Sequence, residues 1–213
     1  IISLNSGQDA LRTEVNWDNH YKQMPAYISK VGESAGQMYG FIYEGTYKLD
    51  EFDVTTDGKG NKIYTLKKGI PYYSGNTQPG DPKYRNLNDD NVINDEDKTA
   101  IGNGQPKHTG GFTNNFTYKN FDLNIFLQWS YGNDILNANR MVFENPASKQ
   151  NTNMFASYVN RWTFDNPTSD MPRARANGSK EYSSLYVEDG SFLKLKNITL
   201  GYNFDKKLLQ PLH

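Results

Sequence analysis

The segment FDLNIFLQWSY at 121–131 constrains the fold of this 213-residue chain more than any other. Its odd-numbered residues are all apolar or aromatic, and its even-numbered residues are polar apart from Phe126. Because successive side chains of a β-strand point to opposite faces, this alternation predicts a strand with one apolar and one polar face. An alternation of about eleven residues is long beside the usual strand of about five or six.

A second alternating run, TGGFTNNFTY, lies just before it and places Phe112, Phe116 and Tyr118 on one face. Lys119 and Asn120 join the two runs, and asparagine tolerates the positive φ that tight turns require. We therefore predict a long hairpin over 109–131.

A third long strand is predicted at 191–204, with the sequence SFLKLKNITLGYNF. Its residues alternate from Asn197 onward, but Leu193 and Leu195 fall in the opposite phase. Either a β-bulge before Asn197 or a strand that rises out of a membrane into a covered region would explain the change of phase.

Composition excludes several classes of protein. The chain has a formal net charge of -1, which gives no general attraction to nucleic acid, and it has no cysteine for a disulfide, a thiolate zinc site or a catalytic thiol. No apolar run approaches the roughly 18 residues of a transmembrane helix, but the strands of a membrane barrel also lack such runs. The chain opens without a signal peptide, so we expect either a protein that is not secreted or an internal piece.

Two all-β architectures remain open from periodicity alone: an outer-membrane barrel and a soluble antiparallel sandwich. Tyr118, Trp129, Tyr131 and Tyr202 lie near strand ends, where aromatic residues gather at membrane interfaces, and the strands are long. The short turn at 119–120 and the long polar connection after Tyr131 also match the short inner turns and long outer loops of such barrels.

The segment NLNDDNVINDED at 86–97 has the rhythm of a calcium loop. Oxygen ligands at its positions 1, 3, 5, 7, 9 and 12 would come from Asn86, Asn88, Asp90, the Val92 carbonyl, Asn94 and Asp97. Asn86 replaces the usual Asp, and Asn91 replaces the usual Gly, although asparagine tolerates the left-handed conformation. The alternative is a loop held by Asx-turns without an ion.

For the remaining acidic, aromatic and arginine residues, both a functional and a purely structural role fit the sequence. No carboxylate pair or nucleophile is singled out, so we expect no catalytic residue and no enzyme. Asp81, Asp89, Asp95 and Glu96 are expected to be solvated. Aromatic residues near Trp162 would stack on a sugar or pack within their loop, and the arginines of the long connection would meet a ligand or serve solubility: Arg140, Arg161, Arg173 and Arg175.

Three blocks resemble, in sequence and in order, the C-terminal part of the SusC/RagA-type TonB-dependent transporters of Bacteroidota outer membranes. They are GQMYGFIYEGTY, then the block from PGDPKYRNLNDD to FLQWSYGNDI, then LYVEDGSFLKLKNITLGYNF. The resemblance covers roughly 36–212. It implies an antiparallel transmembrane barrel of about twenty-two strands with long extracellular loops, closed by a plug.

The resemblance assigns parts of such a barrel to ranges of this chain. The whole chain, 1–213, would be a partial C-terminal barrel region. It would contain an extracellular loop with the calcium-like motif, a transmembrane hairpin, a long extracellular loop and a transmembrane strand, at 71–108, 109–131, 132–190 and 191–204 in that order. We expect the plug, the TonB contact and the signal peptide to lie outside this chain.

Function follows from the resemblance as an expectation. The family imports a nutrient, either an oligosaccharide or a peptide, across the outer membrane, with TonB and a SusD-like surface lipoprotein as partners, outer-membrane lipid and lipopolysaccharide around the barrel, and no nucleic acid. No cofactor is required, and a structural Ca²⁺ is the one ion considered. The alternative function is a soluble cell-surface glycan-binding sandwich stabilised by calcium.

Two sets of side chains would divide between lipid and lumen. We expect these residues to face lipid: Phe121, Leu123, Ile125, Leu127, Trp129, Ile198, Leu200 and Tyr202. We expect these polar residues to face the lumen and the substrate: Asn115, Asn124, Gln128, Asn197 and Asn203.

Overall fold

The computed structural model describes residues 10–14, 25–144, 153–175 and 181–204. Its strands are β1 (Ala10–Glu14), β2 (Pro25–Lys30), β3 (Gln37–Gly40), β4 (Tyr43–Thr46), β5 (Phe52–Thr56), β6 (Lys62–Leu66), β7 (Pro82–Tyr84), β8 (Thr99–Asn103), β9 (His108–Tyr118), β10 (Phe121–Tyr131), β11 (Asp134–Leu136), β12 (Val187–Asp189) and β13 (Phe192–Tyr202). The helical elements are α1 (Ala138–Phe143) and the single 3₁₀ turns η1 (Leu49–Glu51), η2 (Asp95–Asp97), η3 (Ala156–Asn160) and η4 (Ser184–Tyr186).

The chain forms two compact units. One, here called the loop unit, contains residues 1–103 and 136–188, and the other, the sheet unit, contains residues 104–135 and 189–213. The strand pairs with a defined register are antiparallel in both units, which confirms the expected all-β antiparallel class. Within the described residues, no helix combines the length and the apolar character that a membrane-crossing helix needs.

The loop unit is built from small sheets around an aromatic core. Its largest sheet has the strand order β1-β2-β3-β8, and the pairs β4-β7 and β5-β6 stand as separate ladders. Phe41 is stacked on Tyr84 with ring centroids 4.8 Å apart, and Ile93 packs in the same cluster. A second cluster forms around Met141 and Tyr182. These residues come from distant parts of the sequence, so the unit is held by long-range packing.

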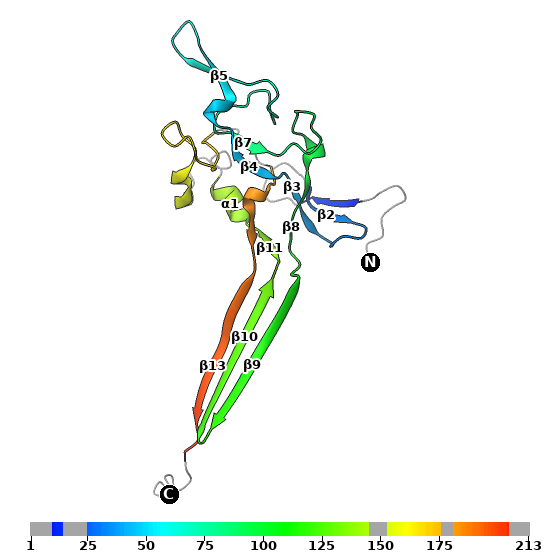
Figure 1. Ribbon diagram of the computed structural model, residues 1–213, viewed down its shortest axis with the longest axis vertical. Helices are drawn as coiled ribbons and strands as arrows, with labels where there is room; N and C mark the ends of the chain where they lie inside the picture. The colour runs from blue at the N-terminus through cyan, green and yellow to red at the C-terminus, as the bar shows by residue number, and fades with distance from the viewer. Residues whose placement is uncertain (1–9, 15–24, 145–152, 176–180, 205–213) are drawn as a thin grey trace. The chain divides into compact units, whose positions relative to one another are not determined.

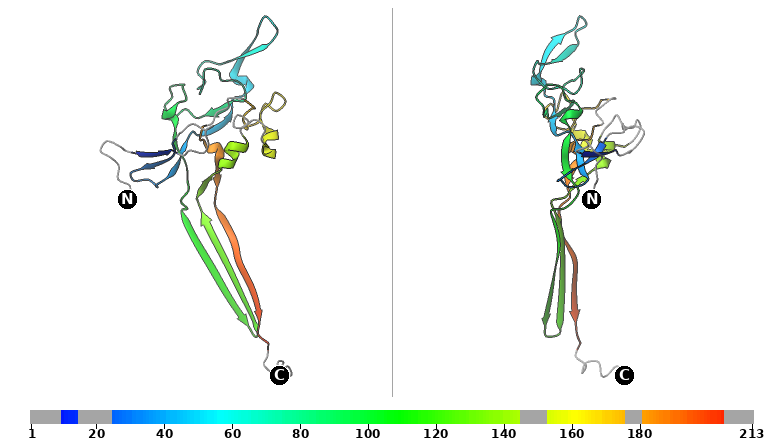
Figure 2. Two further views of the ribbon diagram at one scale, coloured as in Figure 1. Left: turned by 180° about the vertical axis from the view of Figure 1, so that it is seen from behind. Right: turned by 90° about the vertical axis from the view of Figure 1, so that its right-hand side faces the viewer.

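The sheet unit is a single three-stranded antiparallel sheet with the order β13-β10-β9 (Figure 1). Each of the three strands is 11 residues long, and they lie side by side in every view (Figure 2). The hairpin has no register shift: Phe121 pairs with Tyr118 and Tyr131 pairs with His108. The predicted hairpin and third strand are therefore present, with ends within one or two residues of the prediction.

The turn of the hairpin differs from the prediction in one detail. Lys119, not Asn120, has the positive φ, 53°. The Lys119 ammonium lies 5.4 Å from the Tyr118 ring centroid, and the Asn120 carbonyl accepts a hydrogen bond from the Asn203 amide at 2.7 Å. A non-glycine residue in the left-handed region costs free energy, and these contacts with neighbouring residues favour the observed turn.

The third strand carries a β-bulge, which is one of the two explanations offered above for its change of phase. Asn197 pairs with Phe126 and Leu195 pairs with Leu127, so Lys196 is the extra residue on β13. The extra residue reverses the alternation at this point of the strand. Leu193 and Leu195 therefore return to the face that carries Ile198 and Leu200, and the apparent change of phase in the sequence disappears in the sheet.

Candidate functional site

One side of the sheet unit is a continuous apolar surface, called here the apolar face. Cross-strand partners share a face of a sheet, and the register joins apolar residues across all three strands. The apolar face consists of Phe112, Phe116, Tyr118, Phe121, Leu123, Ile125, Leu127, Trp129, Leu193, Leu195, Ile198, Leu200 and Tyr202, and the polar Asn114 of β9 also lies on it, opposite Ile125. It includes all eight residues predicted to face lipid.

The apolar face is uncovered within the part of the chain that the structure describes. Ile198 and Leu200 are 61% and 69% exposed, and the residues of the middle strand are half-buried by the strands beside them. None of the buried core residues among the described ranges belongs to the sheet unit. A soluble protein rarely exposes so large an apolar patch, so this face calls for an apolar surrounding.

Aromatic side chains close the apolar face at both ends. At the turn end, the Phe121 and Tyr202 rings have centroids 4.7 Å apart, and Phe204 lies 5.0 Å from Tyr202. At the other end, His108 stacks on Tyr131 at 5.1 Å, and the Trp129 indole Nε1 donates to His108 Nδ1 at 3.1 Å. In the middle of the face, aliphatic residues of β10 and β13 lie beside Phe112, Asn114 and Phe116 of β9.

The pair Gly110-Gly111 makes room for two of the aromatic rings. A Cβ atom on Gly110 would lie 2.2 Å from the Trp129 ring, and one on Gly111 would lie 2.9 Å from the Phe126 ring. Each ring therefore covers the bare backbone of the neighbouring strand. Larger residues at these positions would push the rings away from β9.

The opposite side of the sheet, called here the polar face, carries a chain of carboxamides. Asn124 Nδ2 donates to Asn115 Oδ1, and Asn197 Nδ2 donates to Asn124 Oδ1 at 3.2 Å, so the contact runs across all three strands. Closer to the turn, Asp122 accepts from Thr117 at 2.9 Å and from Asn203 at 2.8 Å.

The predicted lumen residues therefore lie together. Asn115, Asn124 and Asn197 form the carboxamide chain, Asn203 forms a separate contact with Asp122 closer to the turn, and Gln128 shares their face opposite Gly111. Their predicted contact with the lumen and a substrate stays a prediction. Prediction from the sequence did not place Leu193 and Leu195 on the apolar face, because it left the change of phase open between two explanations. The change of phase before Asn197 was the signal that could have found them.

The acidic loop at 86–97 is closed by hydrogen bonds of the Asx-turn type. Asn86 Oδ1 accepts from the Asp89 amide at 2.9 Å, and Asp90 Oδ1 accepts from the Val92 amide at 2.8 Å. Asn91 has a φ of 64°, as expected for its place in the loop, and Asp89 shares this left-handed conformation. Asp97 is fully buried and accepts from the Leu87 and Asn94 amides at 2.7 and 2.9 Å.

These contacts account for the loop without an ion. Asn88 Nδ2 points its donor at Asp90 Oδ2 and Glu96 Oε2, at 3.0 and 3.3 Å, so the amide must turn over before its oxygen could bind a cation. Among the described residues, no three His, Asp or Glu side chains are grouped as a metal would need. Calcium binding by Asn86, Asn88, Asp90, Val92, Asn94 and Asp97 stays a prediction.

Asp81 contradicts the expectation that it is solvated. Its side chain is buried, and it binds Arg173 Nε at 2.7 Å and Arg175 Nη1 at 2.6 Å. The Arg173 amide also donates to the Gly80 carbonyl at 2.9 Å. Because a buried charge needs partners, the two arginines serve the folding of the long connection. Arg140 is likewise paired with Glu144 and Glu188.

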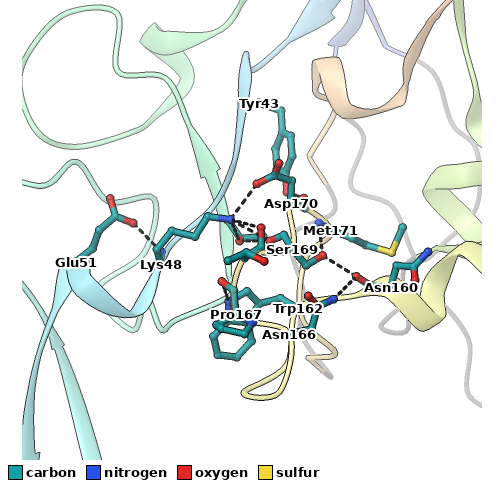
Figure 3. A network of polar contacts seen from close by, with 12 residues as sticks. Tyr43, Lys48, Glu51, Asn160, Trp162, Asn166, Pro167, Ser169, Asp170 and Met171 are labelled. Carbon is teal, nitrogen blue, oxygen red and sulfur yellow. Dashed lines mark hydrogen bonds and ion pairs between the residues drawn. The ribbon is translucent and has the colours of Figure 1, made fainter.

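Lys48 ties the segment 160–171 to β4 (Figure 3). Its ammonium donates to the carbonyls of Thr168 and Ser169, both at 3.1 Å, and to Asp170 Oδ1 at 2.9 Å. Burial, with Tyr186 and Asp170 nearby, raises the pKa of the Tyr43 phenol. Tyr43 therefore stays protonated and donates to the Asp170 carbonyl.

Trp162 packs inside this segment. It is 3% exposed, and its indole Nε1 donates to the Pro167 carbonyl at 3.0 Å (Figure 3). A Cβ atom on Gly80 would lie 2.4 Å from the indole, so glycine lets the ring settle against the backbone. The ring is unavailable for stacking on a sugar, which supports the alternative of packing within the loop.

The sequence of the chain is similar to those of known TonB-dependent receptors. The chain is 34% identical over 190 residues to TonB-dependent receptor P3 of Formosa agariphila, which covers 89% of the chain and 17% of the receptor. It is 24% identical over 171 residues to TonB-dependent receptor SusC of Bacteroides thetaiotaomicron, with 76% of the chain and 16% of SusC covered. No protein-family model matches.

The fold leads to the same group of proteins. It aligns with a chain in the structure of the RagAB peptide transporter with a TM-score of 0.62 and 21% identity, over 96% of this chain and 19% of that one. The long two-faced antiparallel strands are thus those of an outer-membrane transporter barrel segment. The chain belongs to the SusC/RagA-type TonB-dependent receptors. It spans less than one fifth of the length of each relative described, and these relatives are receptors and transporters by name.

Proposed function

We propose that this chain forms part of the barrel wall and outer loops of a TonB-dependent importer in a bacterial outer membrane. The sheet unit would supply membrane-spanning strands, with the apolar face in lipid and the polar face toward the lumen. The loop unit would lie outside the membrane. Import would proceed by binding of a nutrient, followed by energised movement of a plug that opens a path through the barrel.

The continuous apolar face carries this proposal. Without the bulge at Lys196, two leucines would lie among the carboxamides of the polar face, and the apolar face would end halfway along β13. With the bulge, the whole strand matches its neighbours. A sheet whose apolar side is this large and this exposed needs lipid or a second protein layer against it.

The length of the face suits a membrane. Phe121 and Tyr131 are ten residues apart on β10, which is about 34 Å at ~3.4 Å per residue. A tilt of about 40° projects this length onto roughly 26 Å, close to the apolar band of about 25 Å in outer-membrane barrels. The aromatic residues at both ends then lie at the two interfaces.

The partners and the nutrient follow from the family as part of the proposal. The energy would come from TonB through regions outside this chain, and a SusD-like lipoprotein would act as a lid over the loops. The nutrient would be an oligosaccharide or a peptide. RagAB, a structural neighbour, is a peptide transporter by name and supports the peptide class, whereas the oligosaccharide class rests on the family resemblance.

The soluble alternative, a calcium-stiffened glycan-binding sandwich, needs a second sheet over the apolar face. The sheet unit supplies no such layer within its described residues, since its three long strands form a single sheet. The uncovered apolar face therefore both favours a membrane protein and distinguishes the importer from the soluble glycan-binding sandwich.

Detergent dependence of the full-length protein tests the proposal. We expect the protein to sediment with outer membranes and to need detergent for a monodisperse preparation. A monomeric full-length protein that is soluble and free of lipid without detergent would refute the importer and leave the sandwich. Uptake of a labelled nutrient by cells with and without TonB would then test the import step.

A further inference from the structure

A cavity of about 510 Å³ lies in the loop unit, beside the end of β6. Its volume is within the range of about 300 to 1,000 Å³ that is usual for small-molecule sites. The polar side chains and the aromatic ring that line it come from three short segments: Thr65, Lys68, Tyr72, Ser74, Thr77 and Asn91.

The walls of this cavity are fixed by hydrogen bonds. The Tyr72 amide donates to the Asn91 carbonyl at 3.2 Å, and the Ile93 amide donates to the Tyr72 carbonyl at 2.9 Å. The Pro71 carbonyl accepts from the hydroxyl of the fully buried Tyr47 at 2.6 Å. Thr77 Oγ1 donates to the Ser74 carbonyl at 2.5 Å. A site held in this way loses little freedom when a ligand binds.

The charge of the lining is one-sided. Lys67 and Lys68 line the cavity, and no Asp or Glu does. The Lys67 ammonium donates a hydrogen bond to the Asp50 carbonyl at 2.7 Å. Lys68 is exposed, and within the described ranges its ammonium forms no ion pair or hydrogen bond. The cavity therefore offers one cation without a counter-charge.

The remaining groups suit a small polar ligand. The Tyr72 ring is 38% exposed and provides an apolar surface against which a flat or cyclic group can lie. The hydroxyls of Thr65 and Ser74 and the Asn91 carboxamide offer donors and acceptors around it. The free ammonium adds a preference for negative charge, because a charge-assisted hydrogen bond is stronger than a neutral one.

We propose that this cavity binds a carboxylate-bearing end group of the nutrient, with the Lys68 ammonium on the carboxylate and the Tyr72 ring against the body of the group. The carboxylate could belong to an acidic sugar or to the C-terminus of a peptide, and both present the same chemistry to Lys68. This inference rests on the proposed import function and gives it a substrate class.

The experiment uses the full-length receptor in detergent and saturation-transfer NMR. Glucuronic acid is compared with glucose, and N-acetyl-glycylglycine with its C-terminal amide. We expect the acidic member of one pair to bind more tightly than its neutral partner. Lys68→Ala should weaken that binding about tenfold, while Lys68→Arg should retain most of it. Tyr72→Ala should weaken binding of the same probe.

Lys59→Ala is the matched control, since Lys59 is an exposed lysine at the tip of the β5–β6 hairpin and does not line the cavity. It should leave binding unchanged. Equal binding of acidic and neutral probes, no binding of either acid, or equal effects of Lys59→Ala and Lys68→Ala would overturn the proposal. The same sample also shows whether the receptor needs detergent. A receptor that needs detergent but binds acidic and neutral probes equally would refute the proposed ligand of the cavity and leave the proposed import function standing.

Discussion

The two units of this chain use aromatic residues in opposite ways. In the loop unit, Phe41 and Tyr47 are almost wholly buried and pack against residues from distant segments. In the sheet unit, Phe116, Tyr118 and Phe121 stand on an uncovered face. The loop unit thus carries its own core, whereas the described residues of the sheet unit leave their apolar side chains exposed.

The two units also differ in how regularly apolar residues recur along their sequences. The sheet unit alternates by twos along its strands, apart from the bulge at Lys196, because every second residue meets the same surrounding. The loop unit has no sustained period, because each buried ring meets a different neighbour. A segment's period therefore indicates what surrounds it, whereas its aromatic content does not.

Truncation in the core should have the largest effect. Phe41→Ala removes a ring that stacks on Tyr84, and we expect local stability of the loop unit to fall by about 3–5 kcal/mol. The exposed Leu200 is the matched site, and Leu200→Ala should cost far less. Hydrogen exchange of the β4 and β7 amides in the full-length receptor measures the change. Similar losses at both sites would contradict the comparison.

A charge on the apolar face should come next. Ile198→Arg is expected to cost about 2–4 kcal/mol near the middle of a bilayer. Thr199→Arg, one residue further along β13 and on the polar face, should cost little. The free energy of unfolding in lipid vesicles checks both. If the arginine at 198 is as harmless as the one at 199, the apolar face does not meet lipid.

The bulge allows a pair of deletions that tests the register. Loss of Lys196 removes the extra residue and leaves every leucine on the apolar face, so assembly should persist. Loss of Leu195 moves Lys196 onto that face and should cost about 2 kcal/mol. The amount of folded barrel, seen by heat-modifiable gel mobility, reports the outcome. Equal loss from both deletions would argue against the bulge.

The smallest effect is expected at the acidic loop. Asn86→Asp restores the carboxylate usual in calcium loops and should raise the affinity for Ca²⁺ by about tenfold, or ~1.4 kcal/mol. Asp97→Asn serves as the loss-of-ligand control. Calorimetric titration after chelation measures both proteins. If neither the parent nor the Asn86→Asp protein releases or absorbs heat on addition of Ca²⁺, the loop is held by its Asx-turns and binds no calcium.

The sequence predicts more of the structure of the sheet unit than of the loop unit. Alternation alone predicted both faces of the hairpin, and the change of phase before Asn197 indicated either a bulge or a strand that leaves the membrane, of which the structure contains the bulge. The ion pairs of Asp81 with Arg173 and Arg175 join residues more than 90 positions apart in sequence. No local pattern announces such a contact, because it depends on how the long connection folds back on the loop.

The turn and the acidic loop lie between these extremes. The position of the turn followed from the two strands, but the choice of Lys119 over Asn120 for the left-handed conformation depends on contacts with Tyr118 and Asn203. The left-handed Asn91 followed from the calcium-loop pattern, whereas the burial of Asp97 depends on the fold around it.

The central claim is that the apolar face meets lipid and the polar face meets water. The 213 residues contain no cysteine, so single cysteines can be placed and spin-labelled one at a time within them. Labels at 123, 125 and 127 should be accessible to oxygen, and labels at 122, 124 and 128 to a water-soluble nickel reagent, in the full-length receptor in vesicles. On β13, labels at 193, 195, 198 and 200 should follow the oxygen pattern across the bulge. Equal access of both reagents along β10, or an oxygen pattern that fails to change phase at Lys196, would contradict the account.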